Sequence, residues 1–444
     1  MLLLMPKKKK VSTKEKQAAR KQADDLVGVG NGHLERALAA RLEKNLAATL
    51  DALALAEDAY QKATVATGSV HLDSMYNLGV CQAIRSNIAT RLRKQAESLA
   101  ARALAREHFN RVLAGDTSGR SETLALAHTS LASLLVQGTP RRIEEPGDSA
   151  SGLADDALQD LQQAINHINT ALSIHGNLGD LATVASSHLQ AGDAHALSMR
   201  WSILASNTSE AFRHCEAACQ RYDEGLRSPA PVNDLQLLEQ KAKALHGLCC
   251  WAFENNIGEN FRAQFSAALG CAYETAKAVV ALVPPGGGKS VGELLVVCGD
   301  ICELNNNLAE ALQLYQRAVE IAPIADGFAA AADLLLDEGR ARLLAAATEG
   351  ADAAAAVETV RRSAEAFKMA AQTDPSSSVY VYNFACASAL ALNESACLQA
   401  LNELQKKRAA GGKMGAEAAA LLADIAHDVD FNRVRQTPWF AHIK

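Results

Sequence analysis

The sequence predicts an all-α protein, and three observations support this fold class. Hydrophobic residues make up 49% of the 444 residues but aromatic residues only 5%, and much of the apolar content is alanine, the best helix former. Runs of valine, isoleucine and threonine that alternate with polar residues are nearly absent, so we expect no sheet. Residues 295–323 have the apolar pattern of two amphipathic helices followed by Pro323, which cannot continue a helix.

Residues 295–323 also contain the small and large side chains that two closely crossing helices require. Small residues stand at the expected crossing, a tyrosine fills the space beside it, and an alanine leaves room for the next helix pair. The residues at these positions are Leu295, Gly299, Ala311, Tyr315, Ala318 and Pro323. Their spacing resembles that of a tetratricopeptide repeat (TPR). The resemblance implies a right-handed α-solenoid of helical hairpins that binds other proteins.

The pattern of the second helix of such a hairpin recurs along the chain. It has a small or apolar residue, an aromatic or apolar residue four positions later, and a third residue, mostly small, three positions after that. The matches are Ala56/Tyr60/Ala63, Ala105/Phe109/Val112, Ala164/Ile168/Ala171, Ala218/Tyr222/Gly225, Leu269/Tyr273/Ala276, Ala311/Tyr315/Ala318, Ser363/Phe367/Ala370 and Cys397/Leu401/Leu404. We therefore expect about eight TPR-like helical hairpins. Only the last interval, 34 residues, equals the period of the family, so most hairpins have longer helices or inserted loops.

Segments rich in proline, glycine and serine mark the expected loops at residues 137–152, 227–234 and 284–290. The two ends of the chain differ from the repeats between them. The first 22 residues carry a net charge of +7, and because the whole chain carries −6, the remainder carries −13. We expect a disordered basic tail over residues 1–30, the TPR-like α-solenoid over residues 31–426, and a C-terminal capping segment over residues 427–444.

The lysine run of the tail has three interpretations. Its residues are Lys7, Lys8, Lys9 and Lys10. The run is a solvated disordered end, a nuclear-import signal, or a site for RNA or acidic surfaces. No aromatic residue is interleaved to stack on bases, so we do not expect direct binding to nucleic acid.

The C-terminal segment has aromatic and charged residues in alternation. We expect its apolar residues to cover the last hairpin and its charged residues to stay in solvent. The apolar set is Phe431, Val434, Trp439 and Phe440, and the charged set is Asp428, Asp430, Arg433 and Arg435. The alternative is an exposed aromatic peptide for a partner.

The TPR resemblance implies that the first helices of the hairpins line a groove for a peptide or helix of another protein. The candidate groove residues are Tyr76, Asn77, Val80, Glu293, Asp300, Glu303, Tyr382 and Asn383. The two asparagines have a donor and an acceptor for a ligand backbone, or they join neighbouring helices by a hydrogen bond. The three carboxylates and the charge of −13 favour a basic partner. They disfavour the TPR subclass that grips a C-terminal carboxylate.

Neither a catalytic nor a metal-binding motif stands out. The twelve histidines are dispersed, and the ten cysteines form no CxxC pair, as expected of reduced cysteines in a cytosolic or nuclear protein. A metal site at His214, Cys215 and Cys219 lacks a fourth ligand. We expect no catalytic residue, no metal, no cofactor and no small-molecule substrate.

The sequence therefore predicts a non-enzymatic scaffold or adaptor for a partner peptide or helix. One alternative is an assembly chaperone for a basic client, such as a ribosomal or nucleic-acid-binding protein. Another is an enzyme whose active site is assembled from dispersed residues. No segment has the roughly 20 apolar residues that span a bilayer, so we expect the protein in the cytoplasm and, if the lysine run acts as a signal, also in the nucleus.

Overall fold

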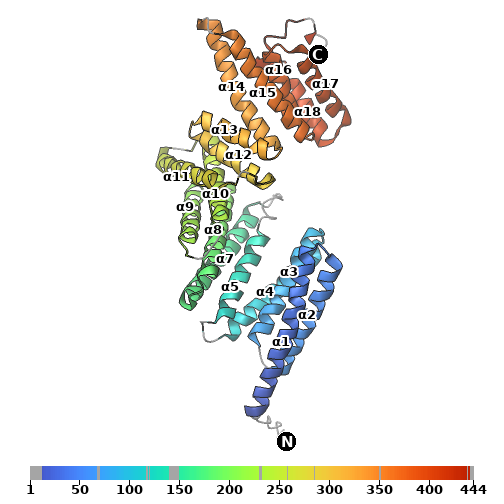
Figure 1. The fold of residues 1–444 in the computed structure, drawn as a ribbon, viewed down its shortest axis with the longest axis vertical. Helices are drawn as coiled ribbons and strands as arrows, with labels where there is room; N and C mark the ends of the chain where they lie inside the picture. Colours follow the sequence, from blue (N-terminus) through green and yellow to red (C-terminus); the bar gives the residue numbers. More distant parts are fainter. Residues whose placement is uncertain are drawn as a thin grey trace. The chain divides into compact units, whose positions relative to one another are not determined.

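The computed structural model describes residues 13–67, 71–116, 119, 121–139, 150–229, 233–257, 259–284, 286–349, 352–437 and 439–440. In these residues the chain forms 17 α-helices and two short 3-10 helices and no strand, which confirms the all-α class. Successive helices pair side by side as hairpins (Figure 1). None of the described helices is both long enough and apolar enough to cross a membrane.

The chain divides into two compact units, residues 1–237 and residues 238–444. The described residues of unit 1 form eight helices that end before α10 (Asp234–Glu254), which spans the division. The helices of unit 1 are α1 (Thr13–Leu42), α2 (Leu46–Thr67), α3 (Leu72–Arg91), α4 (Gln95–Gly115), α5 (Glu122–Gly138), α7 (Ala150–Leu178), α8 (Leu181–Leu204) and α9 (Thr208–Leu226). The elements that follow α10 in unit 2 are η1 (Glu259–Phe261), α11 (Arg262–Leu282), α12 (Lys289–Leu304), α13 (Leu308–Ile321), α14 (Ala325–Glu349), α15 (Ala353–Thr373), α16 (Ser378–Leu390), α17 (Glu394–Ala410), α18 (Gly412–Asp424) and η2 (Val429–Phe431).

All eight second-helix patterns found in the sequence lie on α-helices, namely α2, α4, α7, α9, α11, α13, α15 and α17. Seven of these helices, α2, α4, α7, α9, α13, α15 and α17, pack against the described helix before them. The irregular spacing of these patterns comes largely from helix length. The pair with the TPR-like motif is short, with 16 residues in α12 and 14 in α13, whereas α1 has 30 and α7 has 29. The described residues of the predicted loops at residues 227–234 and 284–290 lie between α9 and α10 and between α11 and α12, except that Asp234 begins α10 and Lys289 and Ser290 begin α12. Most of residues 137–152 lie outside the described part.

Four hairpins share one packing device, in which a glycine of the first helix lies under an aromatic ring of the second. A methyl group added to any of these glycines would overlap the ring, so only glycine lets the two helices approach this closely. The pairs are Gly30 with Tyr60, Gly79 with Phe109, Gly192 with Tyr222, and Gly299 with Tyr315. Each of the four rings is at most 1% exposed. The arrangement expected at the crossing in residues 295–323 is thus present in both units.

The first helix corrects the expected start of the folded chain. Residues 13–30, which we expected in a disordered tail, belong to α1. Its buried residues are Ala23, Gly30 and Ala37, a stripe of small residues seven positions apart that packs on α2. Because this stripe is small and lies among charged residues, it gives a weak hydrophobic signal. Lys7, Lys8, Lys9 and Lys10 lie outside the described residues.

The C-terminal segment packs into the core of the last hairpins. Phe431, Val434 and Phe440 are buried in the same apolar cluster as residues of α16 and α17, and Trp439 packs against that cluster. The expectation that the charged residues of this segment stay in solvent is wrong for Asp430, which is 2% exposed. Its carboxylate is buried because Arg340 of α14 pairs with it.

Candidate binding surface

The candidate groove residues of α12 form two kinds of contact. Glu293 is exposed and lies 3.6 Å from the ammonium of Lys289, one turn earlier. Asp300 and Glu303 both accept a hydrogen bond from the hydroxyl of Tyr315, at 2.7 and 3.0 Å. Asp300 therefore has a structural role, since it satisfies the hydroxyl of the ring that covers Gly299.

The neighbouring first helix, α14, adds two carboxylates that the groove analysis missed. Asp333 and Asp337 are exposed and stand four positions apart, so they lie on one face of α14. Together with Asp300 and Glu303 of α12 they form what we call the acidic surface. Four-residue spacing of acids in the sequence ADLLLDEGR was the available signal, but it counts only once α14 is known to pack beside α12.

The carboxylates of the acidic surface repel one another. The pKa of Asp333 is raised to about 6 by partial desolvation and then by the charges of Asp337 and Glu303. The pKa of Glu303 is raised by desolvation and by Asp300 and Asp337, against the hydrogen bond from Tyr315. Neighbouring carboxylates therefore disfavour the ionised forms of Asp333 and Glu303, which marks a surface with more negative charge than its own cations neutralise.

Two of the four carboxylates have a cationic partner. The imidazole of His246 on α10 lies 3.0 Å from Asp300, and Arg340 donates to Asp337 at 2.9 Å. Burial alone would lower the pKa of His246, but hydrogen bonds with Asp300 and Cys250 raise it to about 10, so this imidazole is charged. Within the described ranges, no ion pair involves Glu303 or Asp333. These two side chains are the part of the surface that is open to a partner's cation.

The candidate groove residues of α16 are covered by the C-terminal segment. Tyr382 is only 8% exposed, and its hydroxyl donates to Asp428 at 2.6 Å. Its interpretation as a free groove residue is therefore wrong, because a segment 46 positions later in the chain occupies that place. Asn383 beside it is partly exposed, and among the described residues none is hydrogen-bonded to its side chain.

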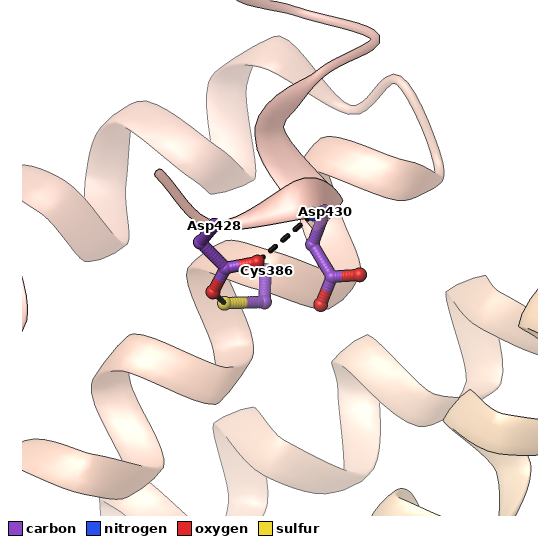
Figure 2. Close-up of side chains that lie close together, drawn as sticks. All are labelled: Cys386, Asp428 and Asp430. Carbon is purple, nitrogen blue, oxygen red and sulfur yellow. Dashed lines mark hydrogen bonds between the residues drawn. The ribbon is translucent and has the colours of Figure 1, made fainter. Parts of the chain in front are cut away.

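The same segment creates the tightest cluster of possible metal ligands in the described residues. Figure 2 shows the side chains of Cys386, Asp428 and Asp430 close together. Their possible ligand atoms lie within 4.8 Å of one another. Their bonding capacity is already used. Cys386 donates to Asp428 at 3.6 Å, and Arg340 binds both oxygens of Asp430. Burial and the two carboxylates raise the pKa of the Cys386 thiol, which keeps it protonated. The cluster joins the C-terminal segment to the side of α16 by hydrogen bonds.

The candidate groove residues of α3 are occupied by contacts within unit 1. The amide of Asn77 donates to Asn31 of α1 at 3.0 Å, which is the helix-to-helix alternative for this residue. Tyr76 packs on Phe109 with ring centroids 5.6 Å apart, and Val80 packs against the same apolar cluster. These three residues therefore stabilise the hairpins by contacts within unit 1.

The histidine and cysteines considered for a metal site are also engaged elsewhere. The Nδ1 atoms of His214 and His195 lie 3.1 Å apart, and both rings are buried. Cys215 and Cys219 are buried on the same helix as His214. In the described part of the chain these residues belong to no group of three ligands.

Comparisons with known proteins give a likeness of fold at low similarity. No protein-family model matches the chain, and no curated protein matches its sequence. A tetratricopeptide repeat protein from Parabacteroides merdae is 12% identical, with 80% of this chain and 98% of that chain covered and a TM-score of 0.34. A circular tandem repeat protein is 13% identical over 96% of each chain, with a TM-score of 0.33. Yeast Tom70 is 13% identical over 95% of this chain and 98% of that chain, with a TM-score of 0.26. At such low identities and TM-scores the likeness assigns neither a family nor a partner.

Proposed function

We propose that this protein is a non-enzymatic interaction scaffold that binds a basic segment of a partner protein on the acidic surface of α12 and α14. The observation that carries the proposal is the pair Glu303 and Asp333, two exposed carboxylates with raised pKa values and no ion pair to a described residue. A lysine or arginine placed between them would relieve their repulsion. A bound cation favours the ionised carboxylate, so partner binding is coupled to proton release near pH 6.

The acidic surface is a better candidate than the groove residues of α3 and α16. Asn77 and Tyr382 use their polar groups on other parts of the same chain. Glu303 shares the hydroxyl of Tyr315 with Asp300, which leaves its second oxygen for a ligand. A role as an assembly chaperone for a basic client is the more specific form of the proposal. The charge of −13 outside the basic N-terminal residues supports it, because complementary charge raises association rates and specificity.

The direct test is binding of a fluorescent lysine- and arginine-rich peptide to the full chain, measured by anisotropy at low salt. We expect the double variant Glu303→Gln/Asp333→Asn to bind about fivefold more weakly, since each surface ion pair is worth up to about 1 kcal/mol. Both substitutions keep the shape of the side chain, and glutamine still accepts from Tyr315. Affinity for the unaltered protein should also fall from pH 7 to pH 5, as Asp333 becomes protonated.

The control is Glu320→Gln, which removes one exposed carboxylate from α13, outside the acidic surface. It should bind the peptide within about twofold of the unaltered protein, as expected for loss of one long-range charge. A binding free-energy loss in the control of half that in the double variant, or more, would show that the peptide responds to net charge alone and would overturn the proposal. Affinity purification followed by mass spectrometry then identifies the natural partners, which should be basic. A partner set that is neutral or acidic would also contradict it.

A further inference from the structure

Unit 1 contains a basic hollow at the end of its first hairpin, far along the chain from the acidic surface. The hollow has a volume of about 200 Å³ and lies where the turn between α1 and α2 meets the last turn of α3. Arg41, Lys44 and Arg91 line it, and no residue of its lining is acidic. We propose that this hollow binds an oxyanion joined to an apolar group, such as the carboxylate of an aliphatic amino-acid residue.

The three cations are free to bind a ligand. Among the residues that the structure describes, none forms a hydrogen bond or ion pair with their side chains. Two cations close to them in the sequence are paired, since Arg85 binds Glu57 at 2.7 Å and Lys94 binds Glu97 at 2.9 Å. The side chain of Arg93, like those of the three cations, has no hydrogen bond or ion pair to a described residue, but it does not line the hollow. Two guanidinium groups and an ammonium provide the planar forks and the point charge that carboxylates and phosphates favour.

The positions of these cations at helix ends explain part of the positive charge at the hollow, but not why three cations line the same hollow. Arg41 and Arg91 lie in the last turns of α1 and α3, where a cation interacts well with the helix dipole. The carbonyl groups at both ends are already used, because Lys44 N–H donates to Arg41 O and Leu92 N–H donates to Ile88 O. They therefore offer the cations little. Lys44 lies beyond the last turn of α1, in the turn at φ 58°.

The remaining walls indicate the rest of the ligand. Asn87 has an amide that no described residue uses, and it can donate to an oxyanion. Leu46 and Leu92 are 39% and 46% exposed, which is high for leucine, and they line the hollow with Ile88. An inorganic anion would leave these apolar walls in water. A carboxylate or phosphate on an aliphatic carrier would cover them and gain from their burial.

The test uses saturation-transfer NMR on the full chain with N-acetyl-leucine as the probe and N-acetyl-leucinamide as its uncharged twin. We expect N-acetyl-leucine to bind and the amide to give no signal above background. The variant Arg41→Gln/Arg91→Gln should weaken binding about tenfold, because it removes the charge-assisted donors. The matched control Arg93→Gln removes a cation two positions from Arg91 that does not line the hollow, and should change affinity less than about twofold.

Inorganic phosphate and a phosphorylated aliphatic alcohol serve as competitors that separate the sources of the oxyanion. The phosphorylated alcohol should displace N-acetyl-leucine, whereas inorganic phosphate at the same concentration should not. Binding of the amide as strong as that of the acid, or equal binding by the double variant and the control, would overturn the proposal. Equal competition by inorganic phosphate would overturn its apolar part. Thermal unfolding of each variant, together with the single variant Lys44→Gln at the exposed turn, separates loss of binding from loss of fold.

Discussion

The residue that follows each crossing glycine is polar where the covering ring is a tyrosine and apolar where the covering ring is a phenylalanine. Asn31, Asp193 and Asp300 follow Gly30, Gly192 and Gly299, and each accepts a hydrogen bond from the tyrosine above its glycine, at 2.8, 2.9 and 2.7 Å. Val80 follows Gly79, and the covering ring there is a phenylalanine, Phe109. A buried hydroxyl needs an acceptor, so the polar neighbour and the tyrosine occur together. Asp300 therefore has a structural role in the α12–α13 hairpin, as the acceptor for the Tyr315 hydroxyl, before any role in binding a ligand.

The co-occurrence of the tyrosine and its polar neighbour can be tested by giving the α3–α4 hairpin a tyrosine. Phe109→Tyr should lower the free energy of unfolding by about 1–3 kcal/mol, because the new hydroxyl is buried beside Val80 without an acceptor. In the Val80→Asn background the same change should cost about 1 kcal/mol less. Chemical denaturation of the four proteins of this cycle gives the coupling energy. A coupling of zero would mean that the hydroxyl finds water or another acceptor.

The helical hairpins close with a common turn. In six turns between successive helices of the described residues, the first helix ends with a residue at positive φ, and the next residue donates back to a carbonyl five positions earlier. The positive-φ residues are Lys44, Arg93, Ser206, Asn256, Asn306 and Leu392. This is the Schellman arrangement. In three of these turns the next residue, Asn45, Asn207 or Asn393, also accepts from the first turn of the following helix. One asparagine thus ends one helix and begins the next.

Leu392 is the member of this set least suited to positive φ, which costs about 1–2 kcal/mol for a residue with a Cβ. Leu392→Asn should therefore raise the stability of unit 2 by up to about 1 kcal/mol, because asparagine tolerates this conformation and already occupies it at Asn256 and Asn306. Leu392 is 53% exposed, so little apolar burial is lost. Thermal unfolding checks whether the midpoint of unit 2 rises in the Leu392→Asn variant. Leu392→Val serves as the opposite control and should lower the midpoint, since β-branched residues are least compatible with positive φ.

The elements differ in how far the sequence predicts them. The second helices were predictable because their small and aromatic residues are required by packing against the preceding helix, as at Ala311 and Tyr315. The start of α1 was not, because its packing stripe of Ala23, Gly30 and Ala37 is hidden among charges. The cover over Tyr382 was not either, since it depends on Asp428, a contact between distant parts of the chain. The sequence predicted only the α12 part of the acidic surface, because Asp333 of α14 joins that surface only when α14 packs beside α12.

On the scale of the whole molecule, histidines give the two units different responses to pH. Unit 1 contains two histidine pairs with Nδ1 atoms 2.8 and 3.1 Å apart, His128 with His167 and His195 with His214. Burial and neighbouring charges lower the pKa values of His128, His195 and His214 to about 4. In unit 2 the pKa of His246 is instead raised to about 10. The stability that His246 contributes is present below its unfolded pKa and is lost as the pH rises toward 10.

The stability of unit 1 changes with pH in the opposite direction. His128, His195 and His214 bind protons more readily in the unfolded chain, so acidification from about pH 6.5 to pH 4 should destabilise unit 1, by up to about 2–3 kcal/mol for each of these buried rings. Asp193 opposes this effect, because burial raises its pKa to about 6, but it is a single group. Hydrogen exchange with mass spectrometry, corrected for intrinsic rates, should show α8 and α9 losing protection between pH 7 and pH 5.

The variant His195→Gln/His214→Gln should reduce that loss, whereas His427→Gln, which replaces an exposed histidine of unit 2, should leave it unchanged. An unaltered loss in the double variant would mean that the pair stays neutral in the folded and unfolded chain alike, and the acid response of unit 1 would then have to come from other groups.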